Sequence, residues 1–397
     1  MAYTMEKSHS PHYFLLESSL GGRYTIEAWD PVEVIEAKPG KNFFALLRSK
    51  LRETPHIDAP DMPFAGGWIG YLSYELYDEI ESSIAPRPTT LIPRAVFARY
   101  DRFEIHEGRK HFQASPSTPH PASSVTSEST REDYIRKVEK IRELIEAGDC
   151  YQVNLSQKFS SIVQHPSDVI YRRLREISPS PFAAYLNLGD AQILSSSPES
   201  FLSVDQRHVT TRPIKGTRSR GATADEDSRL VKELEGSEKD RAELLMITDL
   251  ERSDLGRVCI PGSVRVSELA KVESYPQVHH LVSTIEGDLS EGKDIVDLLR
   301  AVFPGGSITG APKIRAMQII REIEPHTREV YCGAIGFISS NGKAQFNVAI
   351  RTMVIKDGSA HFWSGGGIVA DSEPEAEYEE MLTKAKGMME ALGVNGL

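Results

Sequence analysis

The first hundred residues contain short runs in which apolar and polar side chains alternate. Alternation with a period of two is typical of half-buried strands, and it predicts strands at residues 23–29, 66–72 and 95–100. After residue 130 the period lengthens. Apolar residues then share one helical face over residues 131–146, and Gly148 follows as a stop signal, which predicts a helix over that range.

The rest of the chain predicts more strands than crossover helices. Neighbouring strands are close enough for hairpins, as around Asn341-Gly342. The pattern therefore favours a mixed α/β or α+β architecture with large antiparallel sheets over a doubly wound parallel fold. The expected strands are 150–159, 183–188, 192–196, 331–338, 344–355 and 360–364, and the expected helices are 225–251, 293–302, 312–323 and 374–391.

Residues 112–130 are rich in Ser, Thr and Pro and poor in large apolar side chains. This composition indicates an exposed linker. We therefore expect an N-terminal region over residues 1–111, a linker over 112–130 and a larger C-terminal domain over 131–397.

The net charge of −11 argues against nucleic acid or an anionic membrane as the main partner, although a local basic cluster can still bind a small anion. Three cysteines, Cys150, Cys259 and Cys332, form an odd set without metal-ligand spacing, so a disulfide framework is not expected. No signal-peptide pattern or membrane-spanning apolar segment is visible. We expect a soluble cytoplasmic protein.

The segment Thr211–Arg218 places one lysine, Lys215, between Pro213-Ile214 and Gly216. Proline fixes a backbone angle and glycine has no Cβ, so a ligand can approach the chain closely. A lysine that is partly removed from water can act as a nucleophile near neutral pH. A surface lysine in a polar loop is the alternative for this segment taken alone.

Two predicted helices carry acidic pairs. Asp240 and Glu243 are three residues apart, as are Glu377 and Glu380, so each pair shares one helix face. Two such faces that converge would give an oxygen-only site of the kind Mg²⁺ prefers. The alternative is two solvated faces.

Two glycine-rich segments predict either a ligand contact or a simple turn. Residues 303–313 run into a helix and offer backbone amides and hydroxyls, including that of Ser307, to an anion, but they lack the ending of a Walker loop. Gly365, Gly366 and Gly367 form the second segment.

Three single polar residues are further candidates. Arg351 ends an apolar run and could hold a carboxylate through two hydrogen bonds. Glu199 and His280 could supply a general acid and an orienting group. Taken alone, each of the three is better explained by a structural role.

Together these segments resemble the chorismate-utilising enzymes, the family of anthranilate synthase, aminodeoxychorismate synthase, isochorismate synthase and salicylate synthase. The resemblance runs from about Arg131 to Leu392, and weakly through Leu15–Ser18 and Gly66–Tyr71. The motifs that carry it, in order, are YQVNLSQ, SSSPESF, RPIKGTR, DRAELLMITDLERSDLGRV, HHLVSTIEG, FPGGSITGAPK, YCGAIGF, FNVAIRT and GGGIVADSEPEAEYEE.

The resemblance implies an α/β/β/α sandwich with a cleft between its sheets, and a chorismate site with Mg²⁺ bridging enzyme and substrate carboxylate. It implies that Glu199 assists loss of the C4 hydroxyl and that His280 lies beside the ring. The implied metal ligands are Glu243 and Glu380, supported by Asp240 and Glu377. The implied substrate-binding residues are Gly216, Thr217, Tyr331, Arg351, Gly365, Gly366, Gly367 and Lys384.

Two positions discriminate among the members of this family. Members that add water carry a lysine base where this chain has Gln152, and a glutamine cannot accept that proton. Anthranilate synthases usually carry alanine where this chain has Lys215. The chain therefore resembles the aminodeoxychorismate synthases of folate and para-aminobenzoate synthesis. Anthranilate synthase and a non-catalytic ligand-binding regulator are the alternatives.

The resemblance also implies partners and a second pocket. No cysteine lies in the Gly-x-Cys-x-Gly context of a glutaminase, so we expect a separate glutamine amidotransferase subunit that supplies ammonia, and a downstream aminodeoxychorismate lyase. The segment containing Ser18 resembles the tryptophan-site motif of anthranilate synthase, and Pro181, Phe182 and Ala183 correspond to its other half. We expect either a retained structural tryptophan pocket or an empty relic.

Overall fold

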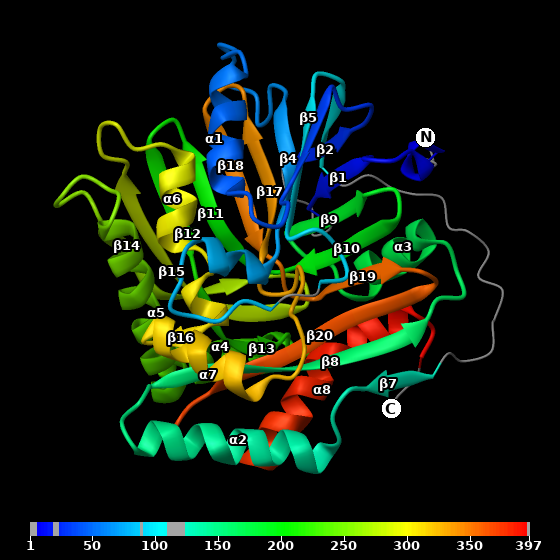
Figure 1. Cartoon of the computed structure of the whole chain (residues 1–397). Helices are drawn as coiled ribbons and strands as arrows, with labels where there is room; N and C mark the ends of the chain where they lie inside the picture. The colour runs from blue at the N-terminus through cyan, green and yellow to red at the C-terminus, as the bar shows by residue number, and fades with distance from the viewer. Residues whose placement is uncertain (1–5, 19–23, 88–89, 109–123, 395–397) are drawn as a thin grey trace.

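The computed structural model of the protein describes residues 6–18, 24–87, 90–108 and 124–394. Two ten-stranded sheets form its interior, and their neighbouring strands are antiparallel throughout the described part of the chain. The fold is therefore the mainly antiparallel α/β/β/α sandwich that was predicted (Figure 1).

The first sheet has the order β16-β8-β20-β19-β10-β9-β1-β2-β6, with β7 paired to β8. Its strands are β1 (Phe14–Glu17), β2 (Tyr24–Ala28), β6 (Phe103–Glu107), β7 (Val125–Ser127), β8 (Gln152–Ile162), β9 (Phe182–Asn187), β10 (Ala191–Ser197), β16 (Gly310–Ala311), β19 (Thr352–Lys356) and β20 (Ser359–Ile368).

The second sheet has the order β13-β15-β12-β11-β18-β17-β4-β5-β3, with β14 paired to β15. Its strands are β3 (Glu33–Glu36), β4 (Gly67–Leu72), β5 (Ala95–Tyr100), β11 (Ser200–Asp205), β12 (His208–Arg212), β13 (Ile214–Ser219), β14 (Arg265–Ser274), β15 (Val278–Asp288), β17 (Ala334–Ser339) and β18 (Lys343–Val348).

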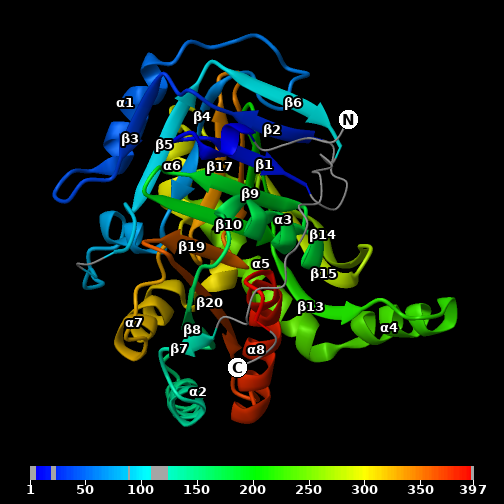
Figure 2. The same cartoon turned by 90° about the vertical axis from the view of Figure 1, so that its right-hand side faces the viewer.

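Helices cover the outer faces of both sheets. Helices α2, α3 and α8 pack on the first sheet, and α4 and α5 pack on the β13–β15 part of the second (Figure 2). The helices are α1 (Phe43–Glu53), α2 (Arg131–Glu146), α3 (Ser167–Ile177), α4 (Ala224–Gly236), α5 (Glu238–Gly256), α6 (Ile295–Val302), α7 (Lys313–Ile323) and α8 (Pro374–Ala391), with 3-10 turns η1 (Glu6–His9), η2 (Tyr74–Glu79) and η3 (Gly306–Ile308).

Aromatic side chains join the two sheets across the core. The ring of Phe14 on β1 lies 5.8 Å from that of Tyr100 on β5. Phe64 lies 5.1 Å from Phe103 of the first sheet and 5.5 Å from Phe337 of the second. Because such offset rings bury large apolar surfaces, these contacts hold the sheets at a fixed separation.

The N-terminal region contributes strands to both sheets. Strand β1 pairs with β9, and β4 pairs with β17. Residues 109–123, which include most of the predicted linker, lie outside the described residues. Strand β7, in the last part of the predicted linker, pairs with β8. The domain boundaries themselves stay a prediction.

Two sequence predictions of single elements were wrong. The helix expected over 225–251 is two helices, because Ser237 is extended and its side chain accepts from the backbone N–H of Asp240 as the N-cap of α5. The strand expected over 344–355 is β18 in one sheet and β19 in the other. The chain crosses between the sheets at Arg351, whose φ is 49°.

Among the described residues, no helix combines the length and apolar character needed to cross a membrane.

Candidate active site

A cleft of about 590 Å³ lies where β8 and β20 of the first sheet face β13 and β15 of the second, with α5 and α8 at its sides. Every predicted catalytic, substrate-binding and metal-binding residue lines it. They are Glu199, Lys215, Gly216, Thr217, Asp240, Glu243, His280, Ser307, Tyr331, Arg351, Gly365, Gly366, Gly367, Glu377, Glu380 and Lys384.

Lys215 lies on β13 directly before a shift in the pairing with β15. Gly216 is the residue at this shift. Its φ is +68°, and a Cβ at this position would lie only 2.8 Å from Leu234 Cδ1, so the backbone here favours glycine. The lysine side chain is 15% exposed, and its Nζ lies 3.4 Å from Gln152 Oε1 and 3.7 Å from Glu243 Oε2. The amine is thus largely enclosed and is held by polar groups inside the cleft.

Glu199 is buried at the base of the cleft, with 6% of its surface exposed. Burial raises the pKa of Glu199 to about 7, and the hydroxyl of Ser307, the charge of Lys215 and the backbone N–H of Ile214 offset part of that rise. A carboxyl that keeps its proton near neutral pH is suited to general acid catalysis.

His280 on β15 is a neutral imidazole. Its Nδ1 lies 2.9 Å from Thr217 Oγ1. Burial, together with the nearby charge of Arg351, lowers the pKa of His280 to about 4. The ring can therefore give or accept a hydrogen bond at pH 7 without adding positive charge to the site.

The four predicted metal ligands line the cleft from α5 and α8, and each has a partner. Glu243 faces Lys215, Glu380 lies 2.7 Å from Lys384, and Asp240 lies 3.3 Å from Arg218. Glu377 accepts a hydrogen bond of 2.6 Å from Ser372.

These carboxylates fit Mg²⁺ in ligand chemistry, because the donor set consists of oxygen atoms alone. In the described part of the chain, however, no three of them bring an oxygen within 4.8 Å of one another. The structure gathers the acidic groups around one cleft without forming a three-ligand cluster.

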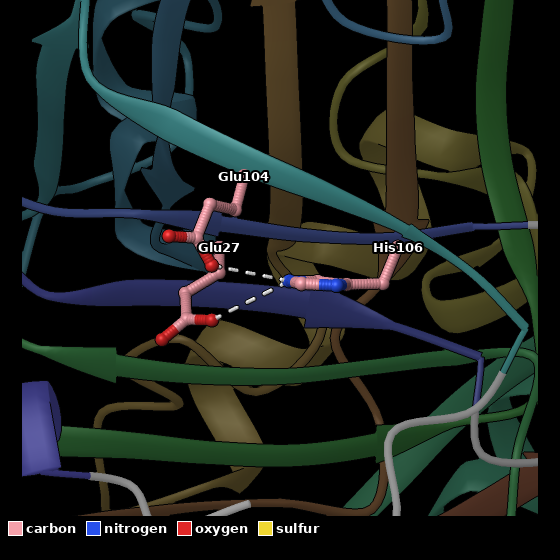
Figure 3. Close-up of side chains that lie close together, drawn as sticks. All are labelled: Glu27, Glu104 and His106. Carbon is pink, nitrogen blue, oxygen red and sulfur yellow. Dashed lines mark ion pairs between the residues drawn. The ribbon is translucent and has the colours of Figure 1, made fainter. Parts of the chain in front are cut away.

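A separate group of three side chains, Glu27 on β2 with Glu104 and His106 on β6, has ligand atoms within 4.8 Å of one another (Figure 3). None of the three lines the cleft. His106 Nε2 is 3.4 Å from Glu104 and 3.9 Å from the buried Glu27. Lys7 is 3.4 Å from Glu104, and Tyr13 donates to Glu27 at 2.9 Å. Because cationic and donor groups already face both carboxylates, we interpret this group as a cross-strand ion-pair network.

The predicted tryptophan-site residues line a second cavity, of about 340 Å³, between β1, β2 and β9 of the first sheet and β17 and β18 of the second. Ser18, Pro181, Phe182 and Ala183 all border it. The rest of its lining is largely apolar, including Leu16, Ile26, Ile335 and Phe337.

Sequence reasoning missed three residues at or behind the cleft. Asn154 and Trp363 line it, and both lie in or beside motifs that carried the resemblance, so their position was a usable signal. Glu251 lies behind the site with 8% exposure and accepts a hydrogen bond of 2.8 Å from Thr211. A glutamate within a helix gives no sequence signal of burial.

Comparison with known proteins identifies the family. The sequence matches the chorismate binding enzymes over residues 12–390. The chain belongs to this family.

The proteins that are similar to this chorismate-binding enzyme include members with two different activities. Aminodeoxychorismate synthase component 1 of Bacillus subtilis is 39% identical, with 96% of this chain and 92% of that protein covered. Anthranilate synthase component 1 of Streptomyces coelicolor is 37% identical, with 96% and 83% covered. The crystal structure of anthranilate synthase component I from Streptococcus pneumoniae superposes with a TM-score of 0.82 at 32% identity, covering 93% of this chain and 92% of that one.

These comparisons confirm the family and the fold predicted from the sequence. The roles of individual cleft residues stay predictions.

Proposed function

We propose that this protein is the chorismate-aminating component of an aminodeoxychorismate synthase, forming 4-amino-4-deoxychorismate from chorismate and ammonia. The observation that carries the proposal is Lys215, a largely enclosed amine among the polar groups of the cleft. Aminodeoxychorismate synthase relatives at 39–43% identity support it.

In the first step, the Lys215 amine adds to C2 of the chorismate ring in its deprotonated form, which is the form that is nucleophilic. Both conjugated double bonds of the ring shift as the C4–oxygen bond breaks, and Glu199 gives its proton to the departing hydroxyl, which leaves as water. Burial supports this role for Glu199, because it keeps the carboxyl protonated near pH 7.

In the second step, ammonia adds at C4 and the bond between C2 and Lys215 breaks. The electron pair returns to the amine, and one proton of the new ammonium group returns to Glu199. Chorismate and ammonia thus give aminodeoxychorismate and water, with the protein restored. His280 and Arg351 hold the substrate, the first through a neutral hydrogen bond and the second through its charge.

Glu243 and Glu380, with Asp240 and Glu377 in support, are the residues that would hold Mg²⁺. When bound, the ion would polarise the substrate carboxylate and the conjugated ring system. Lys215 and Lys384 form ion pairs with two of these carboxylates, Glu243 and Glu380.

The ammonia has to come from outside this chain. All three cysteines are buried, and burial raises the pKa of Cys259 to about 11 and of Cys332 to about 12, so neither is an activated thiolate. We therefore infer a glutamine amidotransferase partner, consistent with the name component 1 of the relatives, and a separate aminodeoxychorismate lyase for release of para-aminobenzoate.

Anthranilate synthase component 1 is the second candidate, because relatives of that activity are nearly as similar as the aminodeoxychorismate synthases. In that reaction ammonia itself would add at C2, and Lys215 would have no covalent role. The cavity beside Ser18 and Ala183 supports a retained tryptophan pocket in either case.

A product assay tests the proposal. The chain is incubated with chorismate, Mg²⁺ and ammonium, with and without an aminodeoxychorismate lyase. Para-aminobenzoate that forms only when the lyase is present supports amination at C4. Fluorescent anthranilate from the chain alone supports the second candidate and contradicts the first.

A further inference from the structure

Asn154 is a polar residue that lines the cleft and takes no part in the catalytic, substrate-binding or metal-binding roles described above. It lies on β8 directly opposite Gly367 of β20, and 6% of its surface is exposed. Its side-chain nitrogen is buried and makes no hydrogen bond to any residue that the structure describes. Buried polar groups in folded proteins are nearly always paired, so an unpaired amide that borders a cleft indicates a partner supplied by the ligand.

The backbone around Asn154 is fixed from both sides. Its N–H donates to Thr309 O at 2.9 Å, and its carbonyl accepts from Arg328 Nη2 at 2.6 Å. Arg328 also donates to Ile308 O at 3.0 Å, beside Ser307 of the cleft. The strand and the glycine-rich loop are thereby tied to one guanidinium group.

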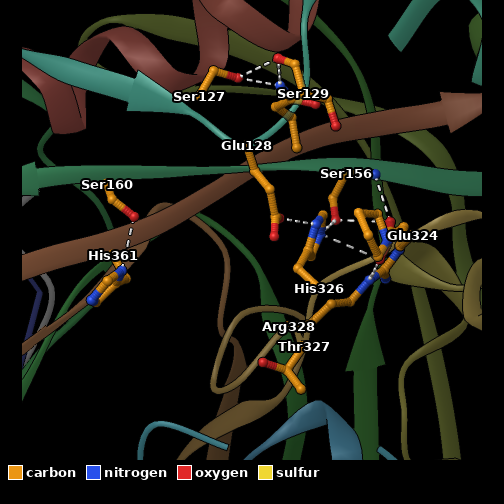
Figure 4. Close-up of polar contacts among 12 residues, drawn as sticks. Ser127, Glu128, Ser129, Ser156, Ser160, Glu324, His326, Thr327, Arg328 and His361 are labelled. Atoms are coloured by element: carbon orange, nitrogen blue, oxygen red, sulfur yellow. Dashed lines mark hydrogen bonds and ion pairs between the residues drawn. The ribbon is translucent and has the colours of Figure 1, made fainter. Parts of the chain in front are cut away.

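Arg328 is itself held in a buried network (Figure 4). Its guanidinium pairs with Glu324 at 2.7 Å, and Glu324 accepts from the backbone N–H of Ser156 at 2.7 Å and from its hydroxyl at 2.8 Å. Ser156 is the second residue after Asn154 on the same face of β8. This network fixes the backbone of β8 at Asn154, so the point from which its side chain reaches the cleft is set before a ligand binds.

In the described part of the chain, two other buried side chains near the cleft, Gln152 and Trp363, also have a nitrogen without a hydrogen-bond partner. Gln152 also has an unpaired side-chain nitrogen, but its oxygen already accepts from Lys215. Trp363 has an unpaired indole nitrogen, but the side chain is 0% exposed and is stacked on Tyr331 with ring centroids 6.4 Å apart. Asn154 is the one of the three that is both uncommitted and partly open to the cleft.

We propose that the side-chain amide of Asn154 is a substrate-contacting group that hydrogen-bonds an oxygen of the bound chorismate anion. This inference rests on the proposed function, since it takes chorismate as the ligand. Hydrogen bonds to charged groups are stronger than neutral ones, so removing this contact should raise KM for chorismate by about 10- to 100-fold.

The test compares Asn154→Ala and Asn154→Asp with a matched buried asparagine, Asn341. Asn341 lies in the β17–β18 turn, where its amide donates to Ala59 O and Met62 O, and it borders neither cavity. Steady-state kinetics with chorismate and ammonium, calorimetric titration of chorismate and thermal melting are measured for each protein.

For Asn154→Ala we expect the KM increase with an unchanged or higher Tm, because no hydrogen bond within the protein is lost. Asn154→Asp should raise KM further, because it sets a carboxylate against an anionic substrate. Asn341→Ala should lower Tm and leave KM unchanged.

The outcomes separate the two proposals. A wild-type protein that neither binds nor converts chorismate overturns the proposed function, and this inference with it. A wild-type protein that converts chorismate, together with Asn154 variants of unchanged KM and chorismate affinity, overturns the role of Asn154 alone. A fall in Tm of Asn154→Ala as large as that of Asn341→Ala, without a change in KM, also overturns it.

Discussion

The two cavities between the sheets each border a buried glutamate, and these two residues are held in opposite ways. Glu17, at the smaller cavity, lies 2.8 Å from Arg175 and accepts from Tyr171 at 2.8 Å. No arginine of the described residues forms an ion pair with Glu199 in the larger cleft, and burial raises the pKa of Glu199 to about 7. The ion pair fixes one carboxylate as a charged structural group, whereas burial without an ion pair leaves the other able to carry a proton.

The linings of the two cavities also differ in polarity. The cleft gathers lysines, carboxylates and a neutral histidine, and one of its amides is unpaired. The smaller cavity is bordered mainly by apolar side chains, and the amide of Asn347, one of its polar residues, is hydrogen-bonded at both ends. We therefore expect chemistry in the cleft and binding or structural roles at the smaller cavity.

The largest effect is expected for Lys215→Ala. If the lysine forms the covalent intermediate, its loss should reduce aminodeoxychorismate formation by on the order of 10³-fold or more, as for other covalent nucleophiles. A coupled lyase assay measures the rate, and thermal melting checks that the variant is folded. If the rate of aminodeoxychorismate formation fell by less than about threefold, the result would contradict a covalent role for Lys215.

Glu199→Gln and Glu17→Gln test the comparison directly. Glu199→Gln should lower kcat by about 10²- to 10⁴-fold with little change in stability, because it removes an acid but no ion pair. Glu17→Gln should lower the free energy of unfolding by about 3–5 kcal/mol with little change in kcat, because Arg175 stays buried. If both variants lose activity to the same degree, the distinction between the cavities fails.

A smaller effect is expected in the pH dependence of the rate. Because the pKa of Glu199 is raised to about 7, the fraction of protonated acid falls above that pH. The value of kcat/KM for chorismate should therefore fall by about tenfold per pH unit on the alkaline side of about pH 7. The falling limb should be absent from the residual activity of Glu199→Gln.

The last effect is expected in the pH dependence of stability, at Glu251, and not in the reaction rate. Burial raises the pKa of Glu251 to about 8 from its usual 4.5, so between these values the folded protein holds a proton that the unfolded chain has lost. The free energy of unfolding should therefore fall as pH rises through this range, by up to about 1.4 kcal/mol per pH unit. Glu251→Gln has no ionisable group at this position. Its free energy of unfolding should therefore fall less between pH 5 and pH 8 than that of wild type.

The control for that prediction is Glu235→Gln, an exposed glutamate on α4. Denaturant unfolding is measured at pH 5 and pH 8. The free energy of unfolding of Glu235→Gln should change between these pH values by the same amount as that of wild type. A Glu251→Gln protein that matches wild type at both pH values would show that Glu251 is ionised in the folded state.

Local sequence signals predicted a helix well where the sequence also marks the end of that helix. The helix expected over residues 131–146 from its apolar face and from Gly148 is α2. In the structure, Thr130 and Asp133 form a capping box at its start, and Gly148 after its end has a φ of +84°. Ser237 and Arg351 were missed as break points. A serine is common within a helix sequence, and the crossing at Arg351 depends on which sheet each strand joins.

The site could be assembled from the sequence only through the resemblance. Spacing placed Asp240 with Glu243 and Glu377 with Glu380, but it could not show that α5 and α8 border the same cleft. Contacts between residues far apart in the chain, such as Lys215 with Gln152 and Thr211 with Glu251, depend on how the sheets face one another. No local pattern contains that information.

The most direct test of the account is to look for the covalent intermediate on Lys215. The protein is mixed with chorismate and Mg²⁺ without ammonia, quenched, and analysed by intact mass and peptide mapping. We predict an adduct with the mass of chorismate less one water on the peptide that contains Lys215, lost on addition of ammonium and absent from Lys215→Ala. Turnover of chorismate with ammonium but no adduct on that peptide would contradict the account.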